Sequence, residues 1–134
     1  MKRLLASGYD RIFQICKCFR NKERGAKHLP ELTMLEWYSA GGNYFDLMVE
    51  CEDLICSIAR NLNGNDEINY QGRQIHLHKP WARLSVAKAF SRYASMPMEN
   101  ALAEDCFDEV MVDKIEPKLG SPRPTFLYDY PASC

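Results

Sequence analysis

Two polar side chains share one face of an otherwise apolar segment, LTMLEWYSA at residues 32–40. The alternation of a β-strand places Glu36 and Tyr38 on the same face as Leu32 and Met34. A carboxylate beside a phenol can hold a ligand ammonium group by one charge-assisted hydrogen bond and one neutral hydrogen bond. The alternative is that Glu36 pairs with a Lys or Arg of the neighbouring strand, which is the more frequent arrangement for a carboxylate on a strand.

A second group of polar side chains follows the preceding alternating segment, YDRIFQICKCFRN at residues 9–21. Arg20 lies at its end, and a planar guanidinium suits bidentate contact with a phosphate or a carboxylate. Residues 22–31 are polar and contain Gly25 and Pro30, which indicates a long loop. Positive loop side chains suit a polyphosphate, although a charged loop tip is usually only solvated. They are Lys22, Arg24, Lys27 and His28.

The segments 9–21 and 32–40 together predict an antiparallel hairpin that positions both groups. Gly41-Gly42 ends its second strand, and Asn43 with Asp46 predicts the start of a helix. An apolar stripe predicts that this helix packs into a core. The stripe consists of Tyr44, Leu47, Met48, Cys51, Leu54, Ile55, Ile58 and Leu62. The side chains expected to point mostly outward are Glu50, Glu52, Asp53 and Arg60.

The remaining sequence mixes short strands and helices. Residues 68–81 predict two short strands, and Ser85 is expected to cap a helix over 86–94. Residues 98–119 predict one or two further helices, and 124–131 predict a final strand. Because helices and strands neither alternate strictly nor segregate, the predicted fold class is α+β, an antiparallel sheet with flanking helices.

Length and composition indicate one ordinary globular domain of 134 residues, with 46% hydrophobic and 26% charged residues. Lys and Arg total 17 against 18 Asp and Glu, so there is no global basic field for nucleic acid or an anionic membrane. No apolar run approaches the roughly 20 residues that span a bilayer, and the first residues lack the apolar stretch of a secretory signal. We therefore expect a cytoplasmic protein with no membrane partner.

The six cysteines are expected to be reduced thiols, because no two of them form a CxxC pair. Cys16 and Cys18, like His76 and His78, are separated by one residue, whereas zinc sites typically use about two to four. We expect no metal site from this spacing. The signature motifs of dinucleotide-binding, P-loop, serine-hydrolase and zinc-protease sites do not occur in the sequence.

The segment RIFQICKCFRNKERGAKHLPELTMLEWY, residues 11–38, resembles motif 2 of class II aminoacyl-tRNA synthetases of the lysyl type. The usual form of that motif is FRNE, a loop, then HNPEFTMLE and an aromatic pair. MKRLLASGYDR resembles the helix leading into the motif, YFDLM the helix after it, and PTFLYDYPAS a later strand. The resemblance implies a partial catalytic core, with one domain over 1–134, the motif 2 region at 9–40, and motifs 1 and 3 absent.

Within this group, TMLEWY and FDEVMVDKIEPKLG are most similar to the paralogues that modify elongation factor P, the EpmA/PoxA/GenX family. The resemblance implies an adenylate-forming ligase that uses ATP and Mg²⁺, activates lysine or β-lysine, and transfers it to elongation factor P. One alternative is a genuine lysyl-tRNA synthetase, which transfers lysine to tRNA. The other is a non-catalytic remnant that only binds an amino acid.

Matched residue by residue, the resemblance also implies individual roles. Arg20 would contact the ATP α-phosphate and stabilise charge as the substrate carboxylate attacks. Glu36 and Tyr38 would receive the lysine-type substrate, with the carboxylate on the ammonium side. The residues implied to contact ATP are Arg20, Asn21, Glu23, His28 and Leu32.

Three positions depart from the family pattern in the nucleotide-binding half. Lys22 replaces the acid of FRNE, while Leu29 and Leu32 replace the amide and the aromatic residue of HNPEF. Leu32 can still pack against adenine, but it offers no π face. Because motif 3 would supply a second ATP arginine and metal-binding acids, the chain alone is expected to be inactive. The sheet edge left without motif 3 strands predicts self-association or a homodimer.

Overall fold

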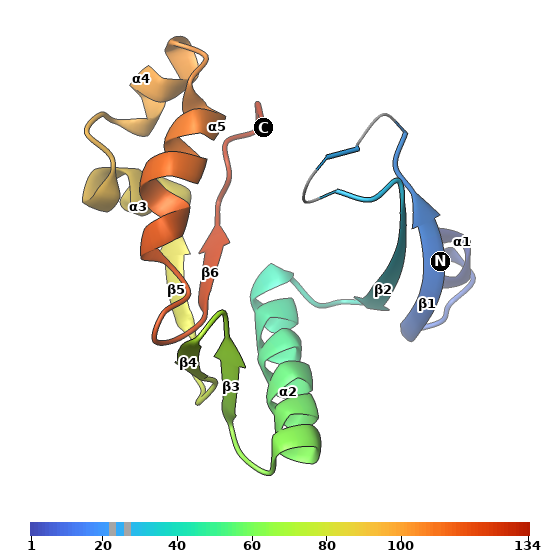
Figure 1. The fold of residues 1–134 in the computed structure, drawn as a ribbon. Helices are drawn as coiled ribbons and strands as arrows, with labels where there is room; N and C mark the ends of the chain where they lie inside the picture. Colours follow the sequence, from blue (N-terminus) through green and yellow to red (C-terminus); the bar gives the residue numbers. More distant parts are fainter. Residues whose placement is uncertain (22–23, 26–27) are drawn as a thin grey trace. The chain divides into compact units, whose positions relative to one another are not determined.

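The computed structural model describes residues 1–21, 24–25 and 28–134, which form two compact units, Met1–Leu47 and Met48–Cys134 (Figure 1). The first unit contains α1 (Lys2–Ala6), β1 (Arg11–Phe19), β2 (Glu31–Ser39) and the start of α2 (Tyr44–Asn63). The second contains the rest of α2, β3 (Glu67–Tyr70), β4 (Arg73–His76), β5 (Ala82–Ser85), α3 (Val86–Tyr93), α4 (Met98–Ala103), α5 (Phe107–Val110), the helical turns η1 (Met111–Ile115) and η2 (Glu116–Lys118), and β6 (Thr125–Tyr128). This mixture confirms the predicted α+β class.

The first unit is built around the hairpin of β1 and β2. The strands pair antiparallel from Arg11 opposite Ser39 to Phe19 opposite Glu31. Beyond the last pair, the Arg20 N–H donates to the Pro30 carbonyl at 2.9 Å. The predicted hairpin is therefore confirmed, and the long connection between its strands begins at Arg20.

The two faces of this hairpin differ in exposure, because successive side chains of a strand point to opposite sides. One face is half-buried, and we call it the Glu36 face. It carries Ile12, Gln14, Cys16 and Cys18 of β1 and Leu32, Met34, Glu36 and Tyr38 of β2. The opposite face leaves large apolar side chains in solvent, with Phe13 72%, Ile15 67% and Phe19 74% exposed.

The start of α2 is fixed by two reciprocal hydrogen bonds. The Asn43 Oδ1 accepts from the Phe45 N–H at 2.8 Å, and the Asp46 Oδ2 accepts from the Asn43 N–H at 2.8 Å. This arrangement satisfies backbone donors that the first helical turn would otherwise leave unpaired. The predicted helix start is confirmed.

The buried side of α2 differs from the predicted stripe. Its buried residues are Met48, Glu52, Cys56 and Ala59. Several predicted core residues are exposed instead: Tyr44, Leu47, Ile58 and Leu62. The prediction of a wholly buried stripe is therefore wrong, because the helix turns a neighbouring row of side chains toward β3, β4 and the segment after them.

Glu52 was expected to point outward and is instead only 3% exposed. Its Oε1 accepts a hydrogen bond from the Trp81 backbone N–H at 3.1 Å and lies 3.6 Å from the Arg83 Nη2. A buried carboxylate is tolerated when it is both hydrogen-bonded and paired with a cation. Both partners lie far along the chain, so the helical pattern gives no sign of them.

The second unit contains two strand pairs of opposite kind. β3 and β4 pair antiparallel across Gln71 and Gly72, whose φ angles of 50° and 77° suit a tight hairpin turn. β5 and β6 pair parallel, which adds a parallel ladder to the antiparallel pairing expected from the sequence. Between β5 and α3, the Ser85 Oγ accepts from the Lys88 N–H at 3.4 Å, which confirms the predicted cap.

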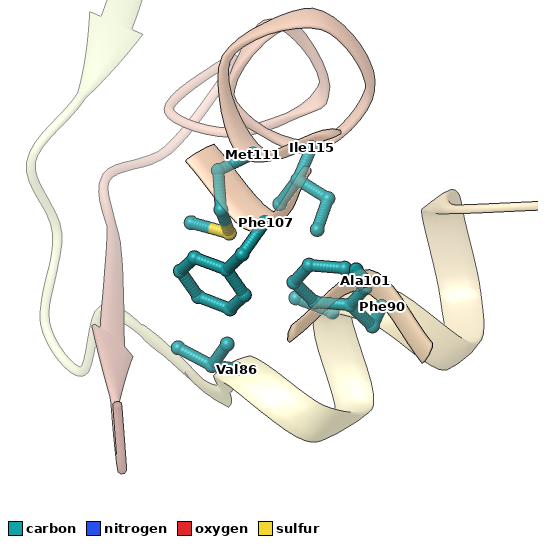
Figure 2. Close-up of a cluster of buried hydrophobic side chains, with 7 residues drawn as sticks. Val86, Phe90, Ala101, Phe107, Met111 and Ile115 are labelled. Carbon is teal, nitrogen blue, oxygen red and sulfur yellow. The ribbon is translucent and has the colours of Figure 1, made fainter. Parts of the chain in front are cut away.

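Apolar side chains of the second unit form two clusters. In Figure 2, Val86 and Phe90 of α3 face Phe107 of α5, and the Phe90 and Phe107 ring centroids are 5.2 Å apart. In the other cluster, Trp81 stacks on Phe126 of β6 with a centroid distance of 5.4 Å. These clusters hold the short helices and strands of this unit together.

Candidate functional site

Glu36 lies at the centre of a hydrogen-bonded cluster on the Glu36 face. Its Oε1 accepts from the Tyr38 hydroxyl at 2.5 Å, and its Oε2 accepts from the Gln14 Nε2 at 2.7 Å. The bond from Tyr38, and then the bond from Gln14, lower the pKa of the Glu36 carboxyl. The same bond raises the pKa of the Tyr38 hydroxyl. At neutral pH the cluster therefore carries one carboxylate beside a protonated phenol.

The cluster presents hydrogen-bond acceptors. Tyr38 and Gln14 each donate a hydrogen bond to Glu36, so the Tyr38 oxygen and the Gln14 carbonyl remain available as acceptors. Gln14 also occupies the position directly opposite Glu36, so the expected alternative of a Lys or Arg from the neighbouring strand is wrong. A carboxylate with two neutral acceptors beside it is chemically suited to an ammonium group.

An open cavity of about 430 Å³ adjoins this cluster. Gln14, Glu36 and Tyr38 form one part of its lining, and Met1, Lys2 and Arg3 form the rest. The cavity thus combines a carboxylate with two cationic side chains of α1. Opposite charges within one cavity are complementary to a ligand that carries both an ammonium and a carboxylate group.

Arg20 lies at the far end of the same hairpin. It follows the last β1 residue, and strand alternation assigns it to the side of Cys18 and Gln14. Arg20 lies six positions after Gln14 in the sequence, which corresponds to about 20 Å along a strand. Such a separation leaves room for an extended amino acid and a phosphate between the side chains of Glu36 and Arg20.

The other predicted ATP-contacting residues lie around the loop. Asn21 and His28 are exposed, and His28 exchanges backbone hydrogen bonds of 3.2 and 3.3 Å with Gly25. Leu32 is half-buried on the Glu36 face, opposite Cys18. Glu23, like Lys22 and Lys27 of the basic loop, lies outside the described residues. The structure therefore brings Leu32, Glu36 and Tyr38 onto one face.

Gln14 is the member of the cluster that sequence reasoning missed. Alternation alone places it on the face of Cys16, yet it does not show which residue of the second strand lies opposite. Its signal is a polar side chain on an otherwise apolar face of β1. That signal becomes informative once the register pairs Gln14 with Glu36.

Two features are absent from the residues that the structure describes. Within ranges 1–21, 24–25 and 28–134, no three His, Cys, Asp or Glu side chains gather where they could hold a metal ion. In the same ranges, no helix has the length and apolar character needed to cross a membrane.

Comparison with known proteins identifies the family. Residues 1–134 match the tRNA synthetases class II (D, K and N), and the chain belongs to that family. A lysine–tRNA ligase of Carboxydothermus hydrogenoformans is 36% identical over 98% of this chain and 31% of its own length. A lysine–tRNA ligase of Ralstonia nicotianae is 36% identical over 95% of this chain and 24% of its own length.

A third relative, a lysine–tRNA ligase of Burkholderia vietnamiensis, is 39% identical over 80% of this chain and 21% of its own length. The chain thus spans less than a third of the length of these relatives. The comparisons confirm the class II, lysyl-type part of the resemblance. They give no support to a particular closeness to the elongation factor P branch.

Proposed function

We propose that this chain forms part of the catalytic core of an ATP-dependent ligase that activates lysine for transfer to tRNA. The observation that carries the proposal is the acceptor cluster of Gln14, Glu36 and Tyr38 beside a cavity that also contains Lys2 and Arg3. This cavity suits a cationic amino acid. Relatives named lysine–tRNA ligase support the same substrate.

In the proposed reaction, Glu36 holds the side-chain ammonium of lysine, and Tyr38 accepts a second hydrogen bond from it. The lysine carboxylate attacks the α-phosphorus of ATP, which forms lysyl-adenylate and releases pyrophosphate. Arg20 stabilises the negative charge that develops on the α-phosphate. Asn21, Glu23, His28 and Leu32 are the further residues proposed to contact the nucleotide.

Two versions of this function differ in the molecule that receives the activated lysine. The relatives favour tRNA, because each of the three is named a lysine–tRNA ligase. Transfer of lysine or β-lysine to elongation factor P stays a hypothesis that rests on the segments TMLEWY and FDEVMVDKIEPKLG. The chemistry proposed for Arg20, Glu36 and Tyr38 is the same in both versions.

Calorimetric titration of the purified chain tests the substrate. Lysine is expected to bind more tightly than norleucine, which has a similar side chain without the ammonium group. Comparison of lysine with β-lysine then identifies the preferred backbone of the ligand. Equal affinity for lysine and norleucine would contradict the proposal, and lysine binding without any ATP binding would favour the non-catalytic remnant.

A chimera tests the acceptor. In this chimera, the present chain replaces the aligned segment of the Carboxydothermus hydrogenoformans relative. The remainder of that relative supplies the rest of a synthetase. Pyrophosphate exchange first measures adenylate formation, and Arg20→Ala in the chimera is expected to lower it by about 10²–10³-fold. Radiolabelled lysine is then offered with tRNA or with elongation factor P. Label on elongation factor P alone would overturn the tRNA proposal.

A further inference from the structure

Two thiols and a thioether lie together on the Glu36 face, and the proposed reaction uses none of them. Cys16 and Cys18 are two residues apart on β1, and their Sγ atoms are 3.7 Å apart. Both thiols are free and half-buried. Met34 lies directly opposite Cys16 on β2, on the same face. Three sulfur-bearing side chains therefore share a small area of one sheet face.

The sulfur–sulfur distance matches the spacing required by a shared metal ion. With metal–sulfur bonds of about 2.3 Å, two sulfurs bound to one ion at tetrahedral to trigonal angles lie about 3.8–4.0 Å apart. Cys16 and Cys18 are already close to that spacing. Ligation would need only a small side-chain adjustment on a strand whose backbone is held by pairing with β2.

The ligand types select the ion. Structural zinc sites take four ligands, whereas no third His, Cys, Asp or Glu joins these two thiols among the described residues. Thiolate and thioether ligands are soft and favour Cu(I). We propose that Cys16, Cys18 and Met34 form a binding site for Cu(I). Each ligating thiol releases its proton to solvent, and the two thiolates bind the ion with the Met34 thioether as the third ligand.

The charges around the two thiols support a cation at this position. The Glu36 carboxylate lies on the same face, two residues beyond Met34 on β2. A bound cation reduces the repulsion between two thiolates and the nearby Glu36 carboxylate. Lys17, between the two cysteines, points to the opposite face and pairs with Glu31 at 3.3 Å.

Anaerobic competition with a chromophoric Cu(I) chelator tests the proposal on the reduced, full 134-residue chain. The wild-type chain is expected to withdraw copper from the chelator. The double variant Cys16→Ser/Cys18→Ser is expected to bind copper at least about tenfold more weakly. Removal of a residue that only hydrogen-bonds to a metal ligand already lowers metal affinity by about 10–100-fold, and this variant removes two ligands. Met34→Leu, which keeps the side-chain volume and removes the sulfur, is expected to weaken binding to a smaller extent.

The matched control is Cys51→Ser/Cys106→Ser, which removes two half-buried thiols elsewhere and is expected to keep the wild-type affinity. Circular dichroism reports whether each variant is folded, and the single variant Cys18→Ser replaces the double variant if the latter unfolds. Copper that stays on the chelator with the wild-type chain would overturn the proposal. Wild-type affinity in the folded Cys16 and Cys18 variants would overturn it as well.

Discussion

At Glu36, the bonds that hold the side chain also favour its ionised form. Tyr38 and Gln14 donate to different oxygens of the carboxylate, and both bonds lower its pKa. Each donor leaves an acceptor of its own available for a ligand. The local geometry thus prepares a negative, acceptor-rich surface before any substrate arrives, which limits the reorganisation that binding requires.

Glu36→Gln is expected to weaken lysine binding by about 10–100-fold, because it replaces a charge-assisted hydrogen bond with a neutral one. Calorimetry measures the affinity, and thermal melting is expected to change little. The matched control is Glu31→Gln, which removes a carboxylate from the opposite face of the same strand. A large fall in melting temperature with unchanged lysine affinity would instead make Glu36 a purely structural residue.

Asp66 is expected to make stability depend on pH. It accepts a hydrogen bond from the Arg60 Nη2 at 2.7 Å, and this bond is the main reason that the pKa of its carboxyl is lowered. A lowered pKa means that its stabilising contribution is complete above the ordinary value of 3.8 and is lost as the pH falls through the folded-state pKa. Asp66→Asn should therefore lower the melting temperature at neutral pH but not in strong acid.

The comparison between wild type and Asp66→Asn cancels the titration of every other group that the two proteins share. Asp108→Asn, on an exposed turn of α5, provides the control. A difference in melting temperature that is equally large at both ends of the pH range would show that Asp66 acts without its charge.

At the scale of elements, α3 depends on its contact with α5. Phe90 is fully buried and stacks on Phe107 (Figure 2). Phe90→Ala is expected to lower the free energy of unfolding of this unit by about 3–5 kcal/mol, because it removes buried apolar surface and leaves a cavity. Urea denaturation followed by circular dichroism measures the change. Val112→Ala, at a 56% exposed position, should change stability little.

At the scale of the whole chain, the apolar face opposite Glu36 predicts self-association. Exposed apolar patches promote contact with a second copy, and an unpaired strand edge adds hydrogen-bonding capacity. Phe13→Ser together with Phe19→Ser should shift the protein toward monomer in sedimentation velocity experiments. Leu62→Ser, at another exposed apolar position on α2, is the control. A monomer at every concentration of the wild-type chain would contradict the expectation.

The amino-acid sequence by itself determined the features that depend on neighbours in the chain. Alternation in 9–21 and 32–40 predicted the hairpin and assigned Glu36 and Tyr38 to one face, because a strand has a side-chain period of two. The caps at Asn43 and Ser85 were also predictable from local sequence, because a capping side chain accepts a hydrogen bond from a backbone N–H two or three residues away.

Only the tertiary structure decided the features that join distant residues. The register places Gln14 against Glu36, 22 positions away, and the fold buries Glu52 through Trp81. It also pairs β5 with β6 in parallel, which no local pattern shows. The physical reason is that the free energy of such contacts comes from burial, pairing and desolvation of groups far apart in the chain, and a local pattern of residues records only one of the two partners.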